Sequence, residues 1–488
     1  MLRKFVQPID LRLVFIYLAE LLGVLGLIFI LPLAVSLIFR EFEYSILFSV
    51  LAVLLFAIGY IGRQFQSSYR KKPVLRDALI VTALIYLVYS LVGGLIFRLF
   101  PNCSYINGVF EVMSGLTTTG LTMLVPEYLP KTLIFFRSYT QWLGGLGIII
   151  ISLALLFRPG GAPVKLYASE FGEENIIGSV VKTARIVLKI YALLTICGLI
   201  SFWAAGMGCF DAVIHIMSGI STGGFSAYSD SIGHYKSPVI SMTVCLFMLL
   251  GAVSFPLYYK VAKRGVRHFF RDMQVRVLFI LTALAACLFF LGFGLYFKNL
   301  VPALFQSVTS ITQTGFNTVD MAGLSDKSKY ITILLMIVGG STCSTTGGIK
   351  ILRFIVLLSA LRWLVWKRAL PEEAKISLKV ERVEISPNTL SVVMGFVTAY
   401  MLILFFSTLA LMYLENFNFI DSLFEVASAE GTVGLSVGIT RPDMNVLSKI
   451  LFILNMWLGR LEIIPVLILL SPKTWMKKMR RKSLADER

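Results

Sequence analysis

The chain has 488 residues, of which 57% are hydrophobic and only 15% are charged, and its mean hydropathy is +0.82. These values exclude a set of soluble domains joined by polar linkers, because the chain has too few polar side chains for such surfaces. The formal net charge of +18 raises the question of nucleic-acid binding, so the positions of the basic residues have to decide.

The basic residues lie between apolar segments. Their main clusters are at 70–76, 182–189, 260–276, 362–379 and 473–482. All clusters fall on one side of a membrane if the apolar segments cross it alternately, which is the positive-inside pattern. We therefore predict a multi-pass protein of the cytoplasmic (inner) membrane that contacts lipid, has both termini in the cytoplasm and has no nucleic-acid partner.

Ten apolar segments approach or exceed the roughly 20 residues that a membrane-spanning helix needs. In chain order they are about 13–39, 44–62, 76–100, 132–157, 184–205, 238–261, 274–297, 329–360, 390–414 and 446–470. The first two form an N-terminal pair of helices in a region at 1–72. The other eight form four pairs, which we interpret as repeats 1 to 4 at 73–165, 166–268, 269–380 and 381–472. A basic cytoplasmic tail follows at 473–488.

The connection inside each of the four pairs has the same pattern. A short apolar run, long enough for only half a span, precedes a stretch rich in Gly, Ser and Thr. The four stretches, 114–122, 218–226, 309–317 and 428–436, align without gaps and share one glycine: Gly120, Gly224, Gly315 and Gly434. The repeat length of roughly one hundred residues suits two membrane helices with a loop between them.

Non-helical backbone at membrane depth is tolerated only where protein buries it or where it lines water. A half-helix directs its partly negative carbonyl end towards such a cavity, and the segment after it can present carbonyl oxygens to an ion. Glycine readily adopts the positive φ that turns successive carbonyls to one side. The pattern predicts re-entrant loops around one pore that passes a monovalent cation. The predicted filter residues are Thr118, Thr119, Gly120, Thr222, Gly223, Gly224, Gln313, Thr314, Gly315, Thr432, Val433 and Gly434.

Small residues also allow close helix packing, which is the alternative interpretation of such motifs. The same two interpretations apply to a glycine-rich run inside the segment 329–360, with Gly339, Gly340, Gly347 and Gly348. We expect this run to break the helix and to leave a gating loop in the pore. Lys350 follows it, either as part of the gate or with its ammonium group extended to the cytoplasmic surface.

Two further charged residues lie within apolar segments. Arg460, in the last segment, is expected to be functional as an electrostatic barrier, with an ion pair to Glu462 or a contact with a carbonyl end as the alternative. Glu430 departs from the repeat, whose other members are apolar at that position. We expect it to be buried and hydrogen-bonded, with a side chain that faces the pore and attracts cations as the alternative.

One aligned position in the four short apolar runs is polar in every repeat, with Glu111, His215, Gln306 and Glu425. We expect these side chains to form hydrogen bonds with neighbouring repeats behind the loops.

The chain resembles the Trk/Ktr/HKT superfamily of potassium transporters over about 76–470. Besides the loops, residues 141–148 (QWLGGLGI), 339–350 (GGSTCSTTGGIK) and 459–462 (GRLE) are similar to signature segments of that superfamily. The two extra N-terminal spans resemble the Trk branch, whereas the loop at 431–436 resembles the Ktr branch. The resemblance implies a homodimer with one pore per protomer and a separate cytoplasmic nucleotide-binding regulatory subunit. It also implies potassium selectivity, because sodium-preferring members carry Ser where this chain has Gly120.

The expected function is potassium uptake driven by the membrane potential, with K⁺ as the transported ion and no organic cofactor. A K⁺/H⁺ or K⁺/Na⁺ symporter of the same fold is the alternative, although the sequence shows no series of intramembrane acids for protons. We do not expect an enzyme, because the three histidines lie in unrelated places and no nucleophile, base or metal set is apparent.

Overall fold

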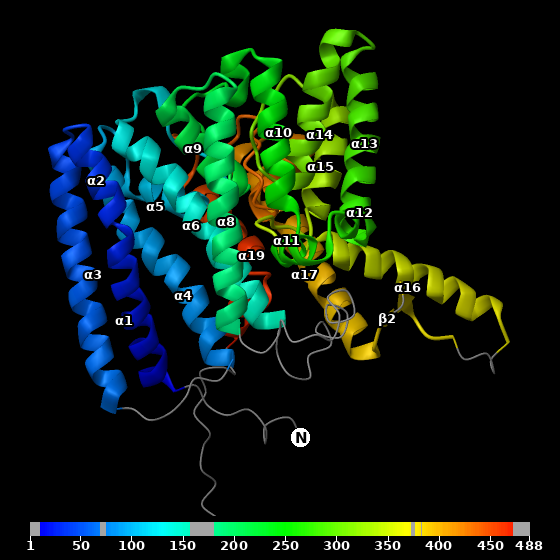
Figure 1. Ribbon diagram of the computed structural model, residues 1–488, viewed down its shortest axis with the longest axis horizontal. Coiled ribbons are helices and arrows are strands. Elements are labelled where there is room, and N and C mark those ends of the chain that lie inside the picture. Colours follow the sequence, from blue (N-terminus) through cyan, green and yellow to red (C-terminus); the bar gives the residue numbers. More distant parts are fainter. Residues whose placement is uncertain (1–9, 69–74, 157–179, 372–375, 382, 472–488) are drawn as a thin grey trace, which may run out of the picture. The chain divides into compact units, whose positions relative to one another are not determined.

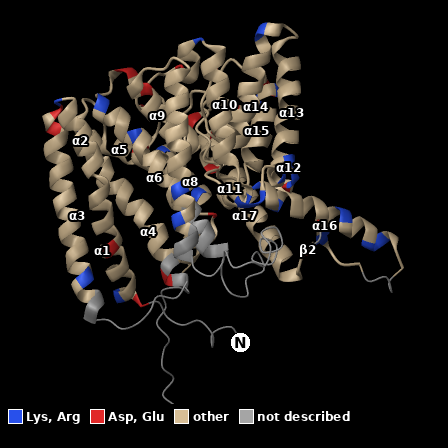
Figure 2. Cartoon of the chain, in the orientation of Figure 1, with Lys and Arg blue, Asp and Glu red and all other residues tan. Residues whose placement is uncertain are grey.

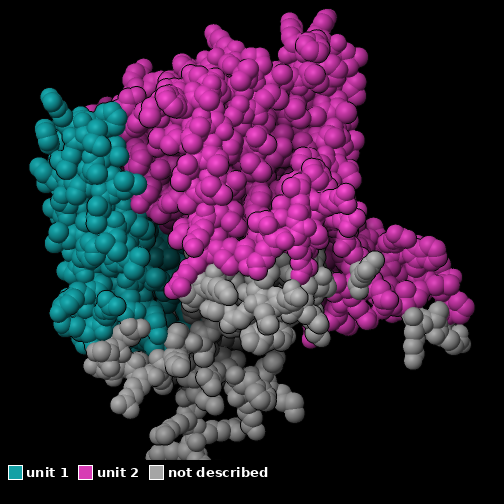
Figure 3. All heavy atoms as spheres, viewed as in Figure 1, with its two compact units in different colours: residues 1–92, 463–488 teal, residues 93–462 magenta. Residues whose placement is uncertain are grey.

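The computed structural model describes residues 10–68, 75–156, 180–371, 376–381 and 383–471. The chain divides into two compact units (Figure 3): unit 1 comprises residues 1–92 and 463–488, and unit 2 comprises residues 93–462. The described secondary structure is helical except for one pair of two-residue strands (Figure 1). Six described helices are long and apolar enough to cross a membrane, or seven if one bent pair counts as a span. The predicted all-α, multi-pass membrane fold is confirmed.

Unit 1 contains α1 (Leu11–Ile28), α2 (Ile30–Ile38), α3 (Phe42–Ser68), most of α4 (Leu75–Gly94) and α20 (Ile464–Leu470). The helices α1 and α3 approach each other closely where both carry glycine. A Cβ added to Gly23 would lie 2.7 Å from the Cα atom of Gly59. This is the small-residue packing that lets two membrane helices touch through their backbones.

Unit 2 contains four short helices of the predicted half-span length. They are α5 (Tyr105–Leu116), α9 (Cys209–Ile220), α14 (Leu300–Thr312) and α18 (Phe419–Glu430). At 1.5 Å per residue, their 12 or 13 residues cover less than two thirds of a bilayer core. Side-chain caps fix where two of them begin, since Ser104 accepts a hydrogen bond from Asn107 N and Asn418 accepts one from Asp421 N.

Each short helix lies between two other helices along the chain. The preceding helices are α4, α8 (Val180–Ala204), α13 (Met273–Phe293) and α17 (Pro387–Glu415). The following helices are α6 (Lys131–Leu156), α10 (Pro238–Ala252), α15 (Asp326–Val338) and α19 (Val446–Arg460). Short 3₁₀ turns occur at Ile96–Leu99, Pro126–Tyr128, Ser231–Tyr235 and Phe297–Asn299.

Four of the ten predicted spans are divided into two helices. The segment 13–39 divides into α1 and α2 with only Phe29 between them, and it still counts as one candidate span. The segment 238–261 divides into α10 and α11 (Phe255–Arg264), which meet at 94°, because Pro256 in the first turn of α11 favours a new helix start. The segment 329–360 divides, as predicted, between α15 and α16 (Ile351–Ala369). The segment 446–470 was wrongly predicted as continuous: α19 ends at Arg460, and positive φ angles at Glu462 and Ile463 break the helix.

The remaining elements of unit 2 are α12 (Arg267–Arg271) and the antiparallel strands β1 (Lys379–Val380) and β2 (Val383–Glu384), in which Lys379 pairs with Glu384. Lys and Arg residues gather on α12 and α16 at one end of unit 2 (Figure 2). The predicted repeat boundaries remain predictions. Those at 72/73 and 165/166, and the basic tail at 473–488, lie outside the described residues.

Candidate functional site

The four short helices of unit 2 are followed by the same backbone conformation. Two residues before each shared glycine, the chain adopts left-handed angles, with φ between 52° and 55° at Thr118, Thr222, Gln313 and Thr432. The shared glycines themselves have φ between 75° and 92°. Positive φ angles at two alternate positions change the direction of successive carbonyl groups. The gap-free alignment of the sequence is therefore matched by a common local geometry.

A hydrogen bond back to the short helix fixes this conformation in each repeat. The N–H groups of Thr119, Gly223, Thr314 and Val433 donate to the carbonyls of Ser114, Ser218, Thr309 and Ser428, at 2.8 to 3.1 Å. In repeats 1 and 4 the serine hydroxyl adds a second bond, from Gly120 N to Ser114 Oγ and from Gly434 N to Ser428 Oγ, both at 3.0 Å. The N–H groups thus point back to the helices, which leaves the carbonyl groups of these residues without bonds to their own short helices.

The four shared glycines form a closed ring of backbone contacts. A Cβ added to Gly120 would meet the carbonyl of Gly223, and one added to Gly224 would meet that of Thr314. A Cβ on Gly315 would meet the carbonyl of Val433, and one on Gly434 would meet that of Thr119, which closes the ring. No side chain fits at these positions, because each glycine lies against the backbone of the next loop.

All four shared glycines also line one cavity of about 330 Å³. Its wall includes the residue two positions after each glycine: Thr122, Ser226, Asn317 and Ser436. Asp320 is a charged residue at its exposed rim. The structure therefore brings all twelve predicted filter residues into one region, with an open chamber on one side of the glycine ring. A larger cavity of about 640 Å³ lies in unit 1 and contains none of the predicted site residues.

The aligned polar position in the short helices is buried in each repeat and hydrogen-bonded, as expected. However, the partners belong to the same repeat and not to neighbouring repeats. Glu111 accepts from Thr122 Oγ1 at 2.5 Å and from Met123 N at 2.6 Å. His215 Nε2 lies 2.9 Å from Ser226 Oγ, and Gln306 Nε2 lies 3.4 Å from Ser310 Oγ. These bonds stay local because the chain turns back alongside its own short helix after the glycine.

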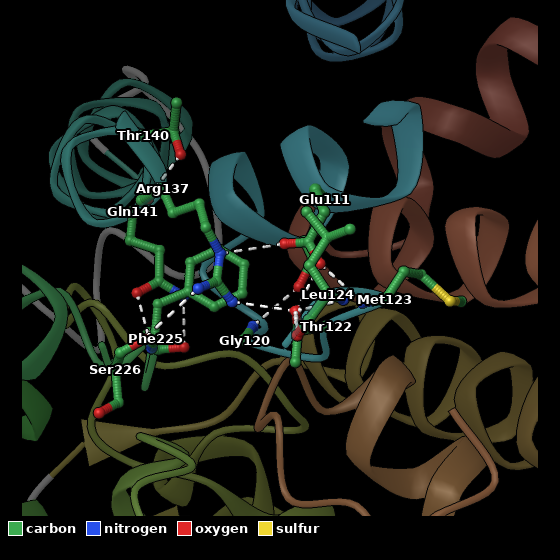
Figure 4. Close-up of polar contacts among 12 residues, drawn as sticks. Glu111, Gly120, Thr122, Met123, Leu124, Arg137, Thr140, Gln141, Phe225 and Ser226 are labelled. Carbon is green, nitrogen blue, oxygen red and sulfur yellow. Dashed lines mark hydrogen bonds and ion pairs between the residues drawn. The ribbon is translucent and has the colours of Figure 1, made fainter. Parts of the chain in front are cut away.

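Arg137 on α6 is a buried cation that sequence reasoning did not single out (Figure 4). Its Nε atom forms an ion pair with Glu111 at 3.2 Å, and its terminal nitrogens donate to Thr122 Oγ1 at 3.0 Å and to Ser226 O at 3.4 Å. Its guanidinium lies 4.1 Å from the centroid of the Phe225 ring. One side chain thus joins the loops of repeats 1 and 2. Its position as a basic residue inside the apolar segment 132–157 is the sequence feature that could have identified it.

Gln141, in the QWLGG segment, supports the second loop in a similar way (Figure 4). Its Oε1 atom accepts from Phe225 N at 3.1 Å, and its Nε2 atom donates to Gly223 O. The amide group can satisfy one donor and one acceptor of the loop at once. It therefore fixes the backbone on both sides of Gly224.

The predicted gating run forms a loop between α15 and α16 that lies against the filter segments. Cβ atoms on Gly339 and Gly348 would meet the amide of Gln313, and one on Gly347 would meet Thr432 and Gly431. Gly340 differs, since its Cβ would meet Thr346 of the same loop and the carbonyl of Ala252. The loop also contacts repeat 2 through Thr345, whose hydroxyl donates to Gly251 O at 2.9 Å.

Arg460 and Lys350 both hold this loop. Arg460, 1% exposed, donates to Thr345 O at 2.5 Å and to Gly144 O at 3.0 Å. The expected contact of Arg460 with carbonyl groups is therefore observed. The alternative ion pair with Glu462 is not, because a Glu462 carboxyl oxygen lies 2.5 Å from a terminal nitrogen of Arg353. Lys350, 3% exposed, donates to the carbonyl of Thr346, so its ammonium group does not reach the surface.

Glu430 is fully buried, as expected, but the expected hydrogen bonds are absent. Neither carboxyl oxygen has a hydrogen-bond partner among the described residues. Its backbone carbonyl lies against α19, where a Cβ on Gly459 would meet it. The carboxyl group is therefore buried in surroundings that do not stabilise a negative charge.

Comparisons with known proteins agree with this geometry. The sequence matches the TrkH family, described as cation transport protein, over residues 81–301 and 296–478. It is 33% identical to the uncharacterized cation transporter MJ1485 of Methanocaldococcus jannaschii, with 93% of this chain and 94% of that protein covered. It is 30% identical to the Trk system potassium uptake protein TrkH of Halomonas elongata, with 96% and 100% covered. The crystal structure of the potassium transporter TrkH from Vibrio parahaemolyticus is similar, with a TM-score of 0.83, 29% identity and 96% and 100% coverage.

Proposed function

Because this chain belongs to the TrkH family of cation transport proteins, which are not enzymes, we propose that it takes up potassium across the cytoplasmic membrane through a filter formed by its four loops. The single observation that carries this proposal is the closed ring of Gly120, Gly224, Gly315 and Gly434 next to one cavity that all four glycines line. The relatives named as potassium uptake proteins support potassium as the cargo.

The filter would bind the ion through oxygen atoms of uncharged groups. In each loop, two residues and the shared glycine would supply carbonyl oxygens, and the N–H group of the residue directly before the glycine is bonded to the short helix. Such oxygen atoms replace the water around a dehydrated monovalent cation. The negative ends of four helices, each equivalent to roughly half an elementary charge, add to the attraction.

The gate would be the loop with Gly339, Gly340, Gly347 and Gly348, held by Lys350 and Arg460. Its contacts with Gln313 and Thr432 place it beside the predicted filter, and the Arg460 contacts with Thr345 and Gly144 connect it to repeats 1 and 4. A buried cation at this point also opposes the passage of a second cation. Movement of the loop would then remove both a steric and an electrostatic obstacle.

We infer a separate cytoplasmic nucleotide-binding regulatory subunit and a homodimer with one pore per protomer. Support comes from the resemblance of the sequence and from the relatives named as parts of a Trk system. The predicted topology places both termini and the basic clusters, including those on α12 and α16, on the cytoplasmic side.

The test is uptake of rubidium-86 or potassium by the purified protein in liposomes under an imposed membrane potential. Uptake without any proton or sodium gradient is the expected result for a channel-like permease. Uptake that requires a proton or sodium gradient would establish the symport alternative. Liposomes without protein, and liposomes with sodium as the only permeant cation, are the controls.

A further inference from the structure

Glu425 on α18 is a fully buried carboxylate that accepts four hydrogen bonds. Its Oε1 atom accepts from Ser436 Oγ at 2.6 Å, from Thr440 N at 2.9 Å and from Thr440 Oγ1 at 2.5 Å, and its Oε2 atom accepts from Val437 N at 2.9 Å. Two of these donors are backbone N–H groups, which can only donate. Burial opposes ionisation of this carboxyl group, whereas the donors directed at both oxygens stabilise its ionised form.

No basic side chain compensates for this charge within the described ranges. At the same aligned position of repeat 1, Glu111 forms an ion pair with Arg137. The basic residues Lys329 and Arg441 form ion pairs with Asp421 and Glu415, respectively, and not with Glu425. The other two aligned positions hold His215 and Gln306. Glu425 is therefore the one carboxylate of this set without a cationic partner among the described residues.

The hydrogen-bond partners of Glu425 form part of the wall of the cavity next to the glycine ring. Ser436 and Val437 line that cavity together with Gly434. The carboxylate thus lies directly behind the cavity wall, and solvent screens a buried charge much less than an exposed one.

We propose that the uncompensated charge of Glu425 sets the cation affinity of the cavity end of the filter. The proposal rests on the four loops being the ion path. Glu425 does not touch the ion: it acts through its electric field and by positioning residues 436–440. If the carboxylate and the bound cation are on the order of 10 Å apart and the effective dielectric constant is about 20, the charge of Glu425 changes the affinity for a monovalent cation roughly tenfold.

The electrostatic role makes a prediction that a purely structural role does not. The Coulomb energy between Glu425 and a bound ion is proportional to the charge of the ion. Losing the carboxylate should therefore change the binding constant of a divalent cation of similar size by the square of the factor for K⁺. In Glu425→Gln we expect the half-saturating K⁺ concentration for uptake in liposomes to rise roughly tenfold, and the inhibition constant of Ba²⁺ to rise roughly hundredfold. Asp443→Asn removes a solvent-exposed charge in the same repeat and should leave both values within twofold.

Gln306→Glu is a second variant that works in the opposite direction. It adds a carboxylate at the aligned position of repeat 3, and it should lower both constants, with the larger factor for Ba²⁺. This variant decides the question if Glu425→Gln does not reach the membrane.

The proposal would be overturned if neither the half-saturating K⁺ concentration nor the Ba²⁺ inhibition constant changed. It would also be overturned if both constants changed by the same factor, because an effect independent of ionic charge indicates a distorted loop. Gly120→Ser, measured in parallel, shows whether only the role of Glu425 is wrong or whether the four loops are not the ion path. If only Glu425 has been assigned wrongly, Gly120→Ser still changes the preference for K⁺ over Na⁺. If the loops are not the ion path, neither variant changes affinity or preference.

Discussion

Arg460 donates a hydrogen bond to the carbonyl oxygen of Thr345 at 2.5 Å, which joins the end of α19 to the glycine-rich loop. The other terminal nitrogen of Arg460 donates to Gly144 O on α6 at 3.0 Å, and the Thr345 hydroxyl donates to Gly251 O at the end of α10. The loop of repeat 3 is thereby connected to all three other repeats.

Replacing Arg460 by methionine should increase potassium uptake. The change removes two charge-assisted hydrogen bonds, worth roughly 1.5 to 3 kcal/mol each, and it removes a cation next to the predicted path. We expect about tenfold faster rubidium-86 uptake in liposomes without any regulatory subunit, which corresponds to roughly 1.4 kcal/mol. Arg441→Met, which removes a partly exposed ion pair with Glu415, is the control. Equal uptake by Arg460→Met and the unmodified protein would contradict a gating role.

Gly120→Ser should reduce the preference for K⁺ over Na⁺. A Cβ at this position would meet the carbonyl of Gly223, so the two loops must separate and their carbonyls must move. The measurement is the ratio of K⁺ to Na⁺ uptake. Gly206→Ser is a matched control, because Gly206 also has a positive φ but has no atom within 4 Å of the added Cβ. An unchanged ratio in folded Gly120→Ser protein would remove Gly120 from the filter.

Breaking the ion pair between Glu111 and Arg137 should lower the stability of the protein more than removing both charges. Arg137→Gln leaves the buried Glu111 carboxylate without its partner, which is expected to cost about 3 to 5 kcal/mol. The double variant Glu111→Gln, Arg137→Gln removes both charges and should recover much of that loss. Thermal unfolding of the protein in detergent measures the stability of the single variants and of the double variant. A double variant that is as unstable as the sum of the single variants would show that the ion pair itself contributes little.

Glu430→Leu should leave potassium uptake within about twofold and should not lower stability. The carboxyl group has no hydrogen-bond partner among the described residues, and an ionised carboxylate without a partner is costly in apolar surroundings, so we expect it to carry a proton. Glu430→Gln keeps the shape without the proton site and serves as the comparison. A large loss of cation affinity in both variants, with normal amounts of folded protein, would indicate that the carboxylate faces the ion.

Several features could be predicted from the sequence because they depend on local periodicity and composition. Apolar length indicated the membrane helices, and the four aligned loops indicated positions where the backbone needs glycine. The interruption at Gly339 followed from glycine inside an apolar segment, since a residue with φ of +74° ends a helix. Family membership followed from these same motifs.

Other features depend on contacts between residues far apart in the chain, and only the tertiary structure decided them. Arg460 could have paired with Glu462, two residues away, but the fold places the Thr345 and Gly144 carbonyls within its reach and gives Glu462 to Arg353. Likewise, Glu111 and Glu425 occupy one aligned position, yet only Glu111 receives a cation, because Arg137 enters from α6. The sequence determined which residues are polar and where the backbone bends. The packing of the helices decided which charges are compensated, because ion pairing depends on distances of a few ångströms that no local pattern encodes.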